Sequence, residues 1–267
     1  MHGQHLKKLI LSTFVLLLLL AANCTARDNT FLFNKTFIDS LSCDFSHLPS
    51  DVIEGSKLTL SKPENITLLA LAGVASIAMN QGADDNTEGY FERHEIFPEF
   101  TDNSLDLIGN PGIQFAATGL WYAFSSKNND LFNQNRAWTM IKALSVTGLA
   151  TVSLKAIRND DTPNGKKWAW PSGHTSSSFA FASVLDEFYG PEVGIPAYVL
   201  ASLVGVRMAD QEDHWASDII FGAAIGWVAG HTIASEDKKM EIAGFKLIPY
   251  SAYTNQSVVG VNLIKRF

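Results

Sequence analysis

Residues 171–175, Pro171-Ser172-Gly173-His174-Thr175, are followed by three serines and have the composition of a loop that turns into a helix. Backbone N–H groups in the first turn of a helix have no intrahelical acceptor, and the helix dipole favours an anion there. The small side chains of Ser172 and Gly173 let an oxyanion approach the backbone. His174 can exchange a proton near neutral pH. Taken alone, the stretch is more typical of a polar helix cap beside a surface histidine.

The neighbouring polar stretches change that interpretation. In residues 207–218, Arg-Met-Ala-Asp-Gln-Glu-Asp-His-Trp-Ala-Ser-Asp, a histidine and an aspartate stand four residues apart, which places His214 and Asp218 on one face of a helix. A carboxylate hydrogen-bonded to one imidazole nitrogen fixes the tautomer and makes the other nitrogen a better nucleophile. Upstream, Lys155 and Arg158 bring two cations to the end of an apolar segment. Cations, an anion-binding turn, two histidines and an orienting aspartate are what phosphoryl transfer through a histidine requires.

In order and spacing, these residues resemble the type 2 phosphatidic acid phosphatase / vanadium-dependent haloperoxidase superfamily. Its signature reads Lys, six residues, Arg-Pro; then Pro-Ser-Gly-His; then Ser-Arg, five residues, His, three residues, Asp. The second part is intact at 171–174, and His214 and Asp218 complete the third. The resemblance covers roughly residues 100–235 and is closest to bacterial-type exported members. It implies an all-α fold, a bundle of about six helices.

The resemblance also implies a reaction. It is the hydrolysis of phosphate monoesters or diphosphates, including lipid-linked ones, through a phosphohistidine and without a metal or other cofactor. His214, oriented by Asp218, would attack phosphorus, and His174 would protonate the leaving oxygen and then activate water. The residues expected to bind the phosphate are Lys155, Arg158, Ser172, Gly173 and Arg207.

The first part of the signature lacks its arginine. Lys155 and Pro163 are in place, but Thr162 stands at the arginine position. The loss of a bidentate phosphate contact removes several kcal/mol of possible transition-state stabilisation. Arg158, one helical turn after Lys155, can supply the missing guanidinium, and so can Arg207.

The third part departs as well. Val206 replaces the serine, and six residues rather than five separate Arg207 from His214. Three alternatives to a hydrolase therefore stay open. A catalytically impaired protein of the same fold would still bind phosphate, and a lipid phosphotransferase would share every site residue. A vanadium haloperoxidase would use the same pocket, although the chain is short for that branch.

Charge and the N-terminus bear on partners and location. The formal net charge of −7 argues against nucleic acid as a partner, because no basic stripe is present. Two lysines precede an apolar run over residues 9–22, which is typical of a signal peptide ending at Ala26. We therefore expect an exported protein, periplasmic or membrane-associated, with an uncleaved anchor as the alternative. Cleavage would leave Cys43 as the single cysteine, so no disulfide framework is expected.

The remaining organisation follows from composition. We expect a signal peptide at 1–26, an irregular or partly helical leader at 27–62, the helical domain at 63–240 and a β-hairpin tail at 241–267. Helices are predicted at 131–157, 173–189, 193–209 and from His214 to about 235. The acidic stretch 84–104 matches no metal-ligand spacing and predicts a solvated loop.

Three uncharged stretches, 65–83, 107–126 and 219–235, raise the question of a membrane. Each is diluted by polar residues, so buried helices of a soluble bundle explain them somewhat better than membrane spans do. The physiological substrate, a phosphorylated small molecule or lipid, is not specified by these patterns. Neither is the oligomeric state.

Overall fold

The computed structural model describes residues 37–239, 241–242, 245–253 and 257–265. The predicted signal peptide, residues 1–26, lies outside this part of the chain. The described residues form nine helices and three strands. In order, the helices are α2 (Phe37–Ser61), α3 (Pro63–Met79), α4 (Ala83–Phe91), α5 (Glu99–Gly109), α6 (Pro111–Lys127), α7 (Leu131–Arg158), α8 (Gly173–Tyr189), α9 (Pro191–Asp210) and α10 (Ala216–Lys239).

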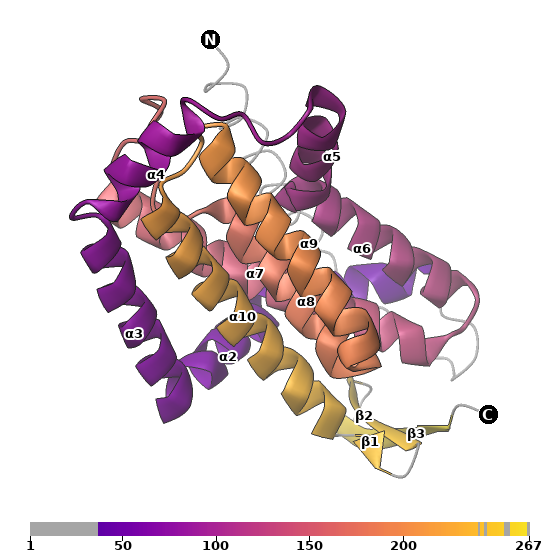
Figure 1. The fold of residues 1–267 in the computed structure, drawn as a ribbon. Helices are drawn as coiled ribbons and strands as arrows, with labels where there is room; N and C mark the ends of the chain where they lie inside the picture. The colour runs from indigo at the N-terminus through magenta and orange to yellow at the C-terminus, as the bar shows by residue number, and fades with distance from the viewer. Residues whose placement is uncertain (1–36, 240, 243–244, 254–256, 266–267) are drawn as a thin grey trace.

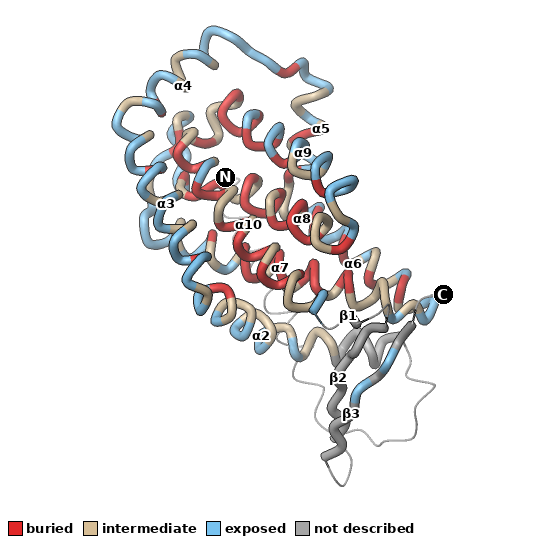
Figure 2. The backbone as a smooth tube through the Cα atoms, turned by 60° about the horizontal axis from the view of Figure 1, so that its bottom comes forward, coloured by how far each residue is buried: buried red, intermediate tan, exposed pale blue. Residues whose placement is uncertain are grey.

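Helix α8 is the centre of an all-α bundle, as expected. Helices α7, α9 and α10 pack around it, α2 and α3 lie on one side, and α5 and α6 lie on the other (Figure 1). Buried residues concentrate on α7, α8 and α10, whereas α3 and α4 are largely exposed (Figure 2). The predictions of helices at 131–157, 173–189 and 193–209 are confirmed by α7, α8 and α9.

Helices α10 and α8 pack backbone against backbone. A Cβ atom added to Gly226 would lie 2.0 Å from the carbonyl oxygen of Ser176. A Cβ atom added to Gly222 would lie 2.7 Å from the carbonyl oxygen of Ser172, the cap of α8, and one added to Gly230 would lie 2.6 Å from that of Ala180. Glycine at every fourth position leaves a flat stripe along one helix face, so two backbones can meet without intervening side chains. This stripe sets how α10 lies against α8.

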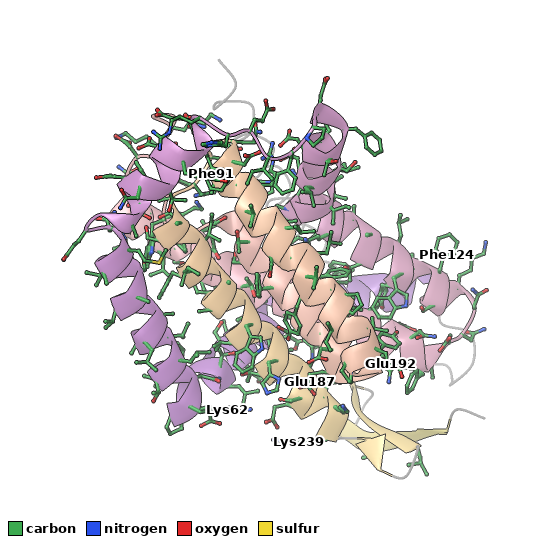
Figure 3. The ribbon with its side chains drawn as sticks, viewed as in Figure 1. Lys62, Phe91, Phe124, Glu187, Glu192 and Lys239 are labelled. Carbon is green, nitrogen blue, oxygen red and sulfur yellow. The ribbon has the colours of Figure 1, made fainter. Side chains whose placement is uncertain are left out.

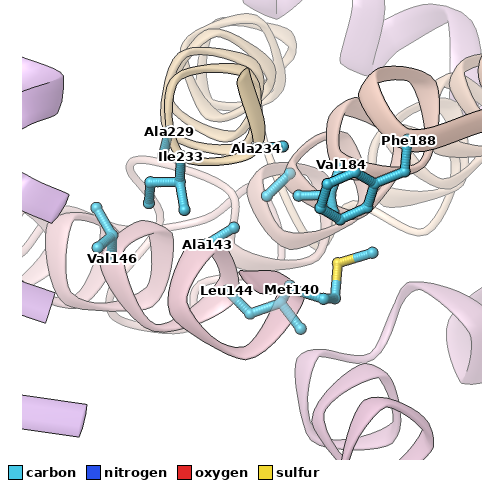
Figure 4. Packing of buried hydrophobic residues seen from close by; sticks show 10 residues of the cluster. Met140, Ala143, Leu144, Val146, Val184, Phe188, Ala229, Ile233 and Ala234 are labelled. Carbon is cyan, nitrogen blue, oxygen red and sulfur yellow. The ribbon is translucent and has the colours of Figure 1, made fainter. Parts of the chain in front are cut away.

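The apolar core lies next to that contact, toward the C-terminal end of α10. Side chains from α7, α8 and α10 meet in one buried cluster, and nine of its ten residues are labelled in Figure 4. The cluster comprises Met140, Ala143, Leu144, Val146, Ala180, Val184, Phe188, Ala229, Ile233 and Ala234. Its alanines keep the helices close, and its branched and aromatic side chains fill the space between them.

The expected leader contains a long helix. Helix α2 covers 37–61 and packs on α7 and α10, where an irregular or partly helical segment was predicted. The junction with α3 is fixed by polar contacts to α10. Asn65 donates to the Thr59 carbonyl and to the Thr232 hydroxyl, and Lys62 pairs with Glu236 at 3.0 Å beside the lower part of α10 (Figure 3). The N-terminal helices are therefore bound to the bundle.

The prediction of a loop at 84–104 is wrong, because this stretch contains α4 and the first half of α5. The buried carboxylate of Asp84 accepts hydrogen bonds from the backbone N–H and hydroxyl of Ser217, at 2.9 Å and 2.6 Å. This tertiary contact holds α4 against the start of α10. The extra short helices account for the larger helix count.

After α10 the chain enters an antiparallel sheet of order β1-β2-β3. The strands are β1 (Glu241–Ile242), β2 (Phe245–Tyr253) and β3 (Ser257–Lys265). Strands β2 and β3 pair from Phe245 opposite Lys265 to Tyr253 opposite Ser257. The sheet lies at the C-terminal end of α10 (Figure 1).

Two glycine substitutions test the α8–α10 contact. Gly226→Ala should lower the free energy of unfolding by about 1–3 kcal/mol or more, because the new methyl group overlaps a backbone oxygen. Gly148→Ala in α7, where an added Cβ meets nothing within 4 Å, should be stabilising by about 0.5–1 kcal/mol. Thermal unfolding midpoints of the purified variants measure both effects. Equal midpoints for the two variants would contradict the packing argument.

Candidate active site

His214 and Asp218 meet at the N-terminal end of α10. Nδ1 of His214 lies 3.3 Å from Oδ2 of Asp218, and both residues are buried. The same carboxylate oxygen accepts the backbone N–H of Trp215 at 3.0 Å. His214 itself lies two residues before α10, not within its first turn as predicted, and its N–H donates to the Met208 carbonyl. The carboxylate on Nδ1 favours the tautomer in which Nε2 carries a lone pair.

The stretch around His174 lies directly beside this pair. The backbone N–H of Ser172 donates to the Asp218 carbonyl at 3.1 Å, which joins the start of α8 to the start of α10. Ser172 caps α8, because its hydroxyl accepts from the Thr175 N–H at 3.4 Å. Nε2 of His174 is buried and has no hydrogen-bond partner among the described residues. A buried ring nitrogen in that state is ready to bind a ligand atom.

Arg207 lies at the end of α9 with its guanidinium surrounded by carboxylates. Nε binds Asp102 at 2.7 Å, and Nη1 binds Asp106 at 3.1 Å and Asp213 at 2.9 Å. Asp106 also lies 3.7 Å from Nε2 of His174. Asp102 and Asp106 belong to α5, which packs against α8 and α9. Carboxylates of α5 therefore occupy the donors with which Arg207 would bind an anion.

The two cations predicted from α7 differ in position. The ammonium group of Lys155 donates to the carbonyl oxygens of Trp168 and Ala169, and its Cε lies 4.0 Å from a Cβ position built on Gly173. Lys155 is thus beside the anion-binding turn. Nε of Arg158 binds Asp160 at 2.6 Å, and its guanidinium stacks 5.1 Å from the Trp170 ring.

Both of these partners of Arg158 lie on the loop after α7, and neither is another predicted site residue. The structure brings together the other seven predicted residues: Lys155, Ser172, Gly173, His174, Arg207, His214 and Asp218. Sequence reasoning missed Asp102, Asp106 and Asp213. Of these three, only Asp213 could have been suspected from the sequence, because it directly precedes His214.

The environment of His174 keeps its imidazole neutral. Burial lowers the pKa of His174 from 6.5 to about 4, and the nearby charges of His214 and Arg207 act in the same direction. Asp106 and Asp213 raise the pKa, but by less. An anion bound between the two histidines would favour the imidazolium and reverse this shift.

The geometry defines what the site can do. One buried histidine is oriented by a carboxylate, and a second histidine with an open nitrogen lies beside it at a helix N-terminus. Lys155 and Arg207 add positive charge. This combination suits attack on phosphorus by nitrogen, with the second histidine exchanging the proton. Within the described part of the chain, no group of three or more His, Cys, Asp and Glu side chains is arranged to hold a metal ion.

Comparisons with known proteins agree with this class of site. Residues 150–238 match the family model of the PAP2 superfamily. A lipid A 1-phosphatase of Porphyromonas gingivalis is 30% identical over 174 residues, which cover 63% of this chain and 38% of that protein. The chain thus spans well under half the length of this relative.

Two solved structures are similar to the fold. A transmembrane PAP2 type phosphatidylglycerolphosphate phosphatase from Bacillus subtilis aligns with a TM-score of 0.54 at 18% identity, over 67% of this chain and 98% of that one. Aquifex aeolicus LpxE aligns with a TM-score of 0.44 at 20% identity, over 52% and 88%. The likeness to the B. subtilis structure concerns the helical fold. Residues 150–238 are thus similar to the PAP2 superfamily, the type 2 phosphatidic acid phosphatases.

The ionisation of His174 can be measured directly. In the free protein its imidazole should titrate near pH 4, and saturating orthovanadate should raise that pKa. Because the bound form takes up a proton, anion affinity should increase as the pH falls through the raised pKa. NMR titration of the ring protons, assigned with His174→Asn, gives both values. A pKa near 6.5 in the free protein would contradict the burial argument.

The carboxylates of α5 give a second prediction. If these aspartates compete with a bound anion for Arg207, Asp102→Asn and Asp106→Asn should each tighten vanadate binding by about tenfold. Each substitution removes an ion pair that stabilises only the vanadate-free protein, so binding no longer has to break it. Glu99→Gln removes the same charge from an exposed position on α5 and should have little effect. Calorimetric titration compares the three. Weaker binding by the aspartate variants would mean that they hold Arg207 in its binding geometry.

Proposed function

We propose that this protein is a phosphatase that hydrolyses phosphate monoesters or diphosphates, lipid-linked ones in particular, through a phosphohistidine and without a metal. The observation that carries the proposal is the junction of α8 and α10. There the histidine of the Pro-Ser-Gly-His motif lies beside the histidine that Asp218 orients. Two histidines with different partners can divide the roles of nucleophile and acid.

In the first step, the lone pair on Nε2 of His214 attacks phosphorus and the bond to the leaving oxygen breaks. His174 gives its proton to that oxygen, and the imidazolium character of His214 is stabilised by Asp218 at 3.3 Å. The dianionic substrate raises the pKa of His174 and so supplies the protonated form that this step needs.

In the second step, water attacks phosphorus and the P–N bond breaks. His174, now neutral, takes a proton from the water, and His214 is released with its lone pair restored. The equatorial oxygens are held by Arg207, Lys155 and the backbone N–H groups after Ser172. Arg158 acts on the rim, because Asp160 and the Trp170 ring hold it outside the group around His214.

A lipid substrate is favoured by the surface of the bundle. Among the described residues, α7, α9 and α10 are long and apolar enough to cross a membrane, and α3 with α4 forms a bent pair that passes the same test. The predicted stretches 65–83 and 219–235 fall on α3 and α10, whereas 107–126 falls on α6, which is not among these spans. Large apolar residues on α3 and α9 are exposed, including Leu71, Val74, Ile77, Ile195 and Val199. A membrane around the bundle would cover them.

Other properties follow from this assignment. With the N-terminal signal, the protein would work outside the cytoplasm, in the periplasm or at its membrane. The P. gingivalis relative acts on lipid A, which makes a phosphorylated glycolipid a reasonable first lipid substrate. A catalytically impaired binder is the main competing function, because Thr162 replaces an arginine and carboxylates occupy Arg207.

The nucleophile assignment has a direct test. In EDTA, the purified protein should release phosphate from an aryl phosphate and from a lipid phosphate, and His214→Ala should abolish both activities. Asp218→Asn should lower kcat by about 10²–10⁴, since the tautomer is no longer fixed. His231→Ala is the matched control. His231 lies in the C-terminal half of α10, away from His214, and pairs with Glu187. Turnover of this variant should therefore stay within about twofold of the unmodified protein.

The preferred substrate decides between a soluble and a lipid role. Turnover that survives in the His214→Ala protein would disprove the mechanism. Vanadate binding without turnover on either substrate would identify the impaired binder.

A further inference from the structure

Two of the three departures from the family signature lie face to face. The loop after α7 contains Thr162, and the turn before α10 contains the additional residue between Arg207 and His214. Several hydrogen bonds join loop and turn. The Asn164 N–H donates to the Glu212 carbonyl at 3.2 Å, the Asn164 amide donates to Asp213 at 3.1 Å, and the Trp215 indole donates to the Asp161 carbonyl at 2.8 Å.

Thr162 closes the turn between residues 162 and 166 through hydrogen bonds. Its hydroxyl donates to the Asn164 side chain at 2.7 Å and accepts the Lys166 N–H at 2.9 Å, while its own N–H donates to the Lys166 carbonyl at 2.8 Å. The residue is buried, and Gly165 completes the turn at φ 76°. An arginine lacks the hydroxyl that closes this turn. Thr162 therefore fixes where Lys166 leaves the loop.

The additional residue completes the arrangement. Glu212 adopts a left-handed conformation, φ 55°, in the turn that contains the insertion. Asp213 then binds Lys166 through Oδ1 at 3.1 Å and Arg207 through Oδ2 at 2.9 Å. Burial raises the pKa of Asp213, but Lys166, Arg207 and Asn164 together lower it below its ordinary value. One ionised carboxylate thus separates the ammonium of Lys166 from the guanidinium of Arg207.

We infer that Lys166 is a phosphate-binding residue that takes the place of the missing signature arginine, with Thr162 and Asp213 as its positioning residues. The inference rests on the proposed function of the site. Lys166 is next to Arg207 across a single carboxylate, and its side chain is 71% exposed, so it can turn from Asp213 to a bound phosphate without disturbing the core. Arg158, the other candidate, is held by Asp160 and Trp170.

Affinity for orthovanadate is the primary test, measured by equilibrium titration of the purified protein and by inhibition of aryl phosphate hydrolysis. Lys166→Ala should weaken vanadate binding and raise KM by about tenfold or more, because a charge-assisted contact is lost. Lys166→Arg should stay within about threefold of the unmodified protein. Lys167→Ala is the control, since Lys167 is similarly exposed and pairs with Asp161 on the same loop.

The positioning role has its own readout. Thr162→Val removes the hydroxyl and should weaken vanadate binding in the presence of Lys166, but should add little to Lys166→Ala. Thr162→Arg combined with Lys166→Ala should restore affinity, because it returns a guanidinium to the signature position. Equal vanadate affinity for Lys166→Ala and Lys167→Ala would overturn the inference, and so would additive effects of Thr162→Val and Lys166→Ala.

The outcome is separable from that of the proposed function. If His214→Ala retains turnover, the nucleophile assignment fails while the vanadate titrations still decide the role of Lys166. If His214→Ala is inactive and Lys166→Ala binds vanadate normally, only the present inference fails.

Discussion

The contact between the backbones of α8 and α10 is the constraint on which the site depends. Gly222, Gly226 and Gly230 let the two helices meet without side chains between them. That approach brings the Ser172 N–H to the Asp218 carbonyl, so the start of α8 and the start of α10 share one hydrogen bond. His174 and His214 come from segments that are forty residues apart in sequence, yet this junction sets their separation. The apolar cluster of α7, α8 and α10 packs the same three helices together farther along α10 and so supports the junction.

Much of the candidate site could be predicted because its residues are local in sequence. A histidine four residues before an aspartate, and a small-residue turn before a helix, carry their geometry with them. The helices α7, α8 and α9 were predictable for the same reason, since each has a long apolar pattern and clear ends. Arg158 shows the limit of spacing arguments. One helical turn after Lys155 places it near the site, but Asp160 and Trp170 decide where its guanidinium rests.

The parts that could not be predicted depend on contacts between distant residues. Helices α4 and α5 begin in an acidic stretch whose composition suggests a solvated loop, and α4 is held by Asp84 on Ser217, 133 residues away. Asp102 reaches Arg207 across 105 residues. Nothing in the local pattern around either aspartate indicates a partner, because an acidic surface and a buried ion pair use the same residue type. The meeting of Thr162 with the turn before His214 likewise became visible only when loop and turn were folded together.

The carboxylates around Arg207 have a consequence for selectivity. A ligand that binds this guanidinium must replace negative charge that is already there. A terminal phosphate carries about −1.5 to −2 charges at neutral pH, more than any one carboxylate it displaces, whereas a phosphodiester carries a single charge and gains little by the exchange. If the proposed function holds, this charge distribution would favour ligands that end in phosphate over phosphodiesters. At a membrane crowded with phosphodiester headgroups, the preference would leave the histidines available for the rarer lipids that end in phosphate.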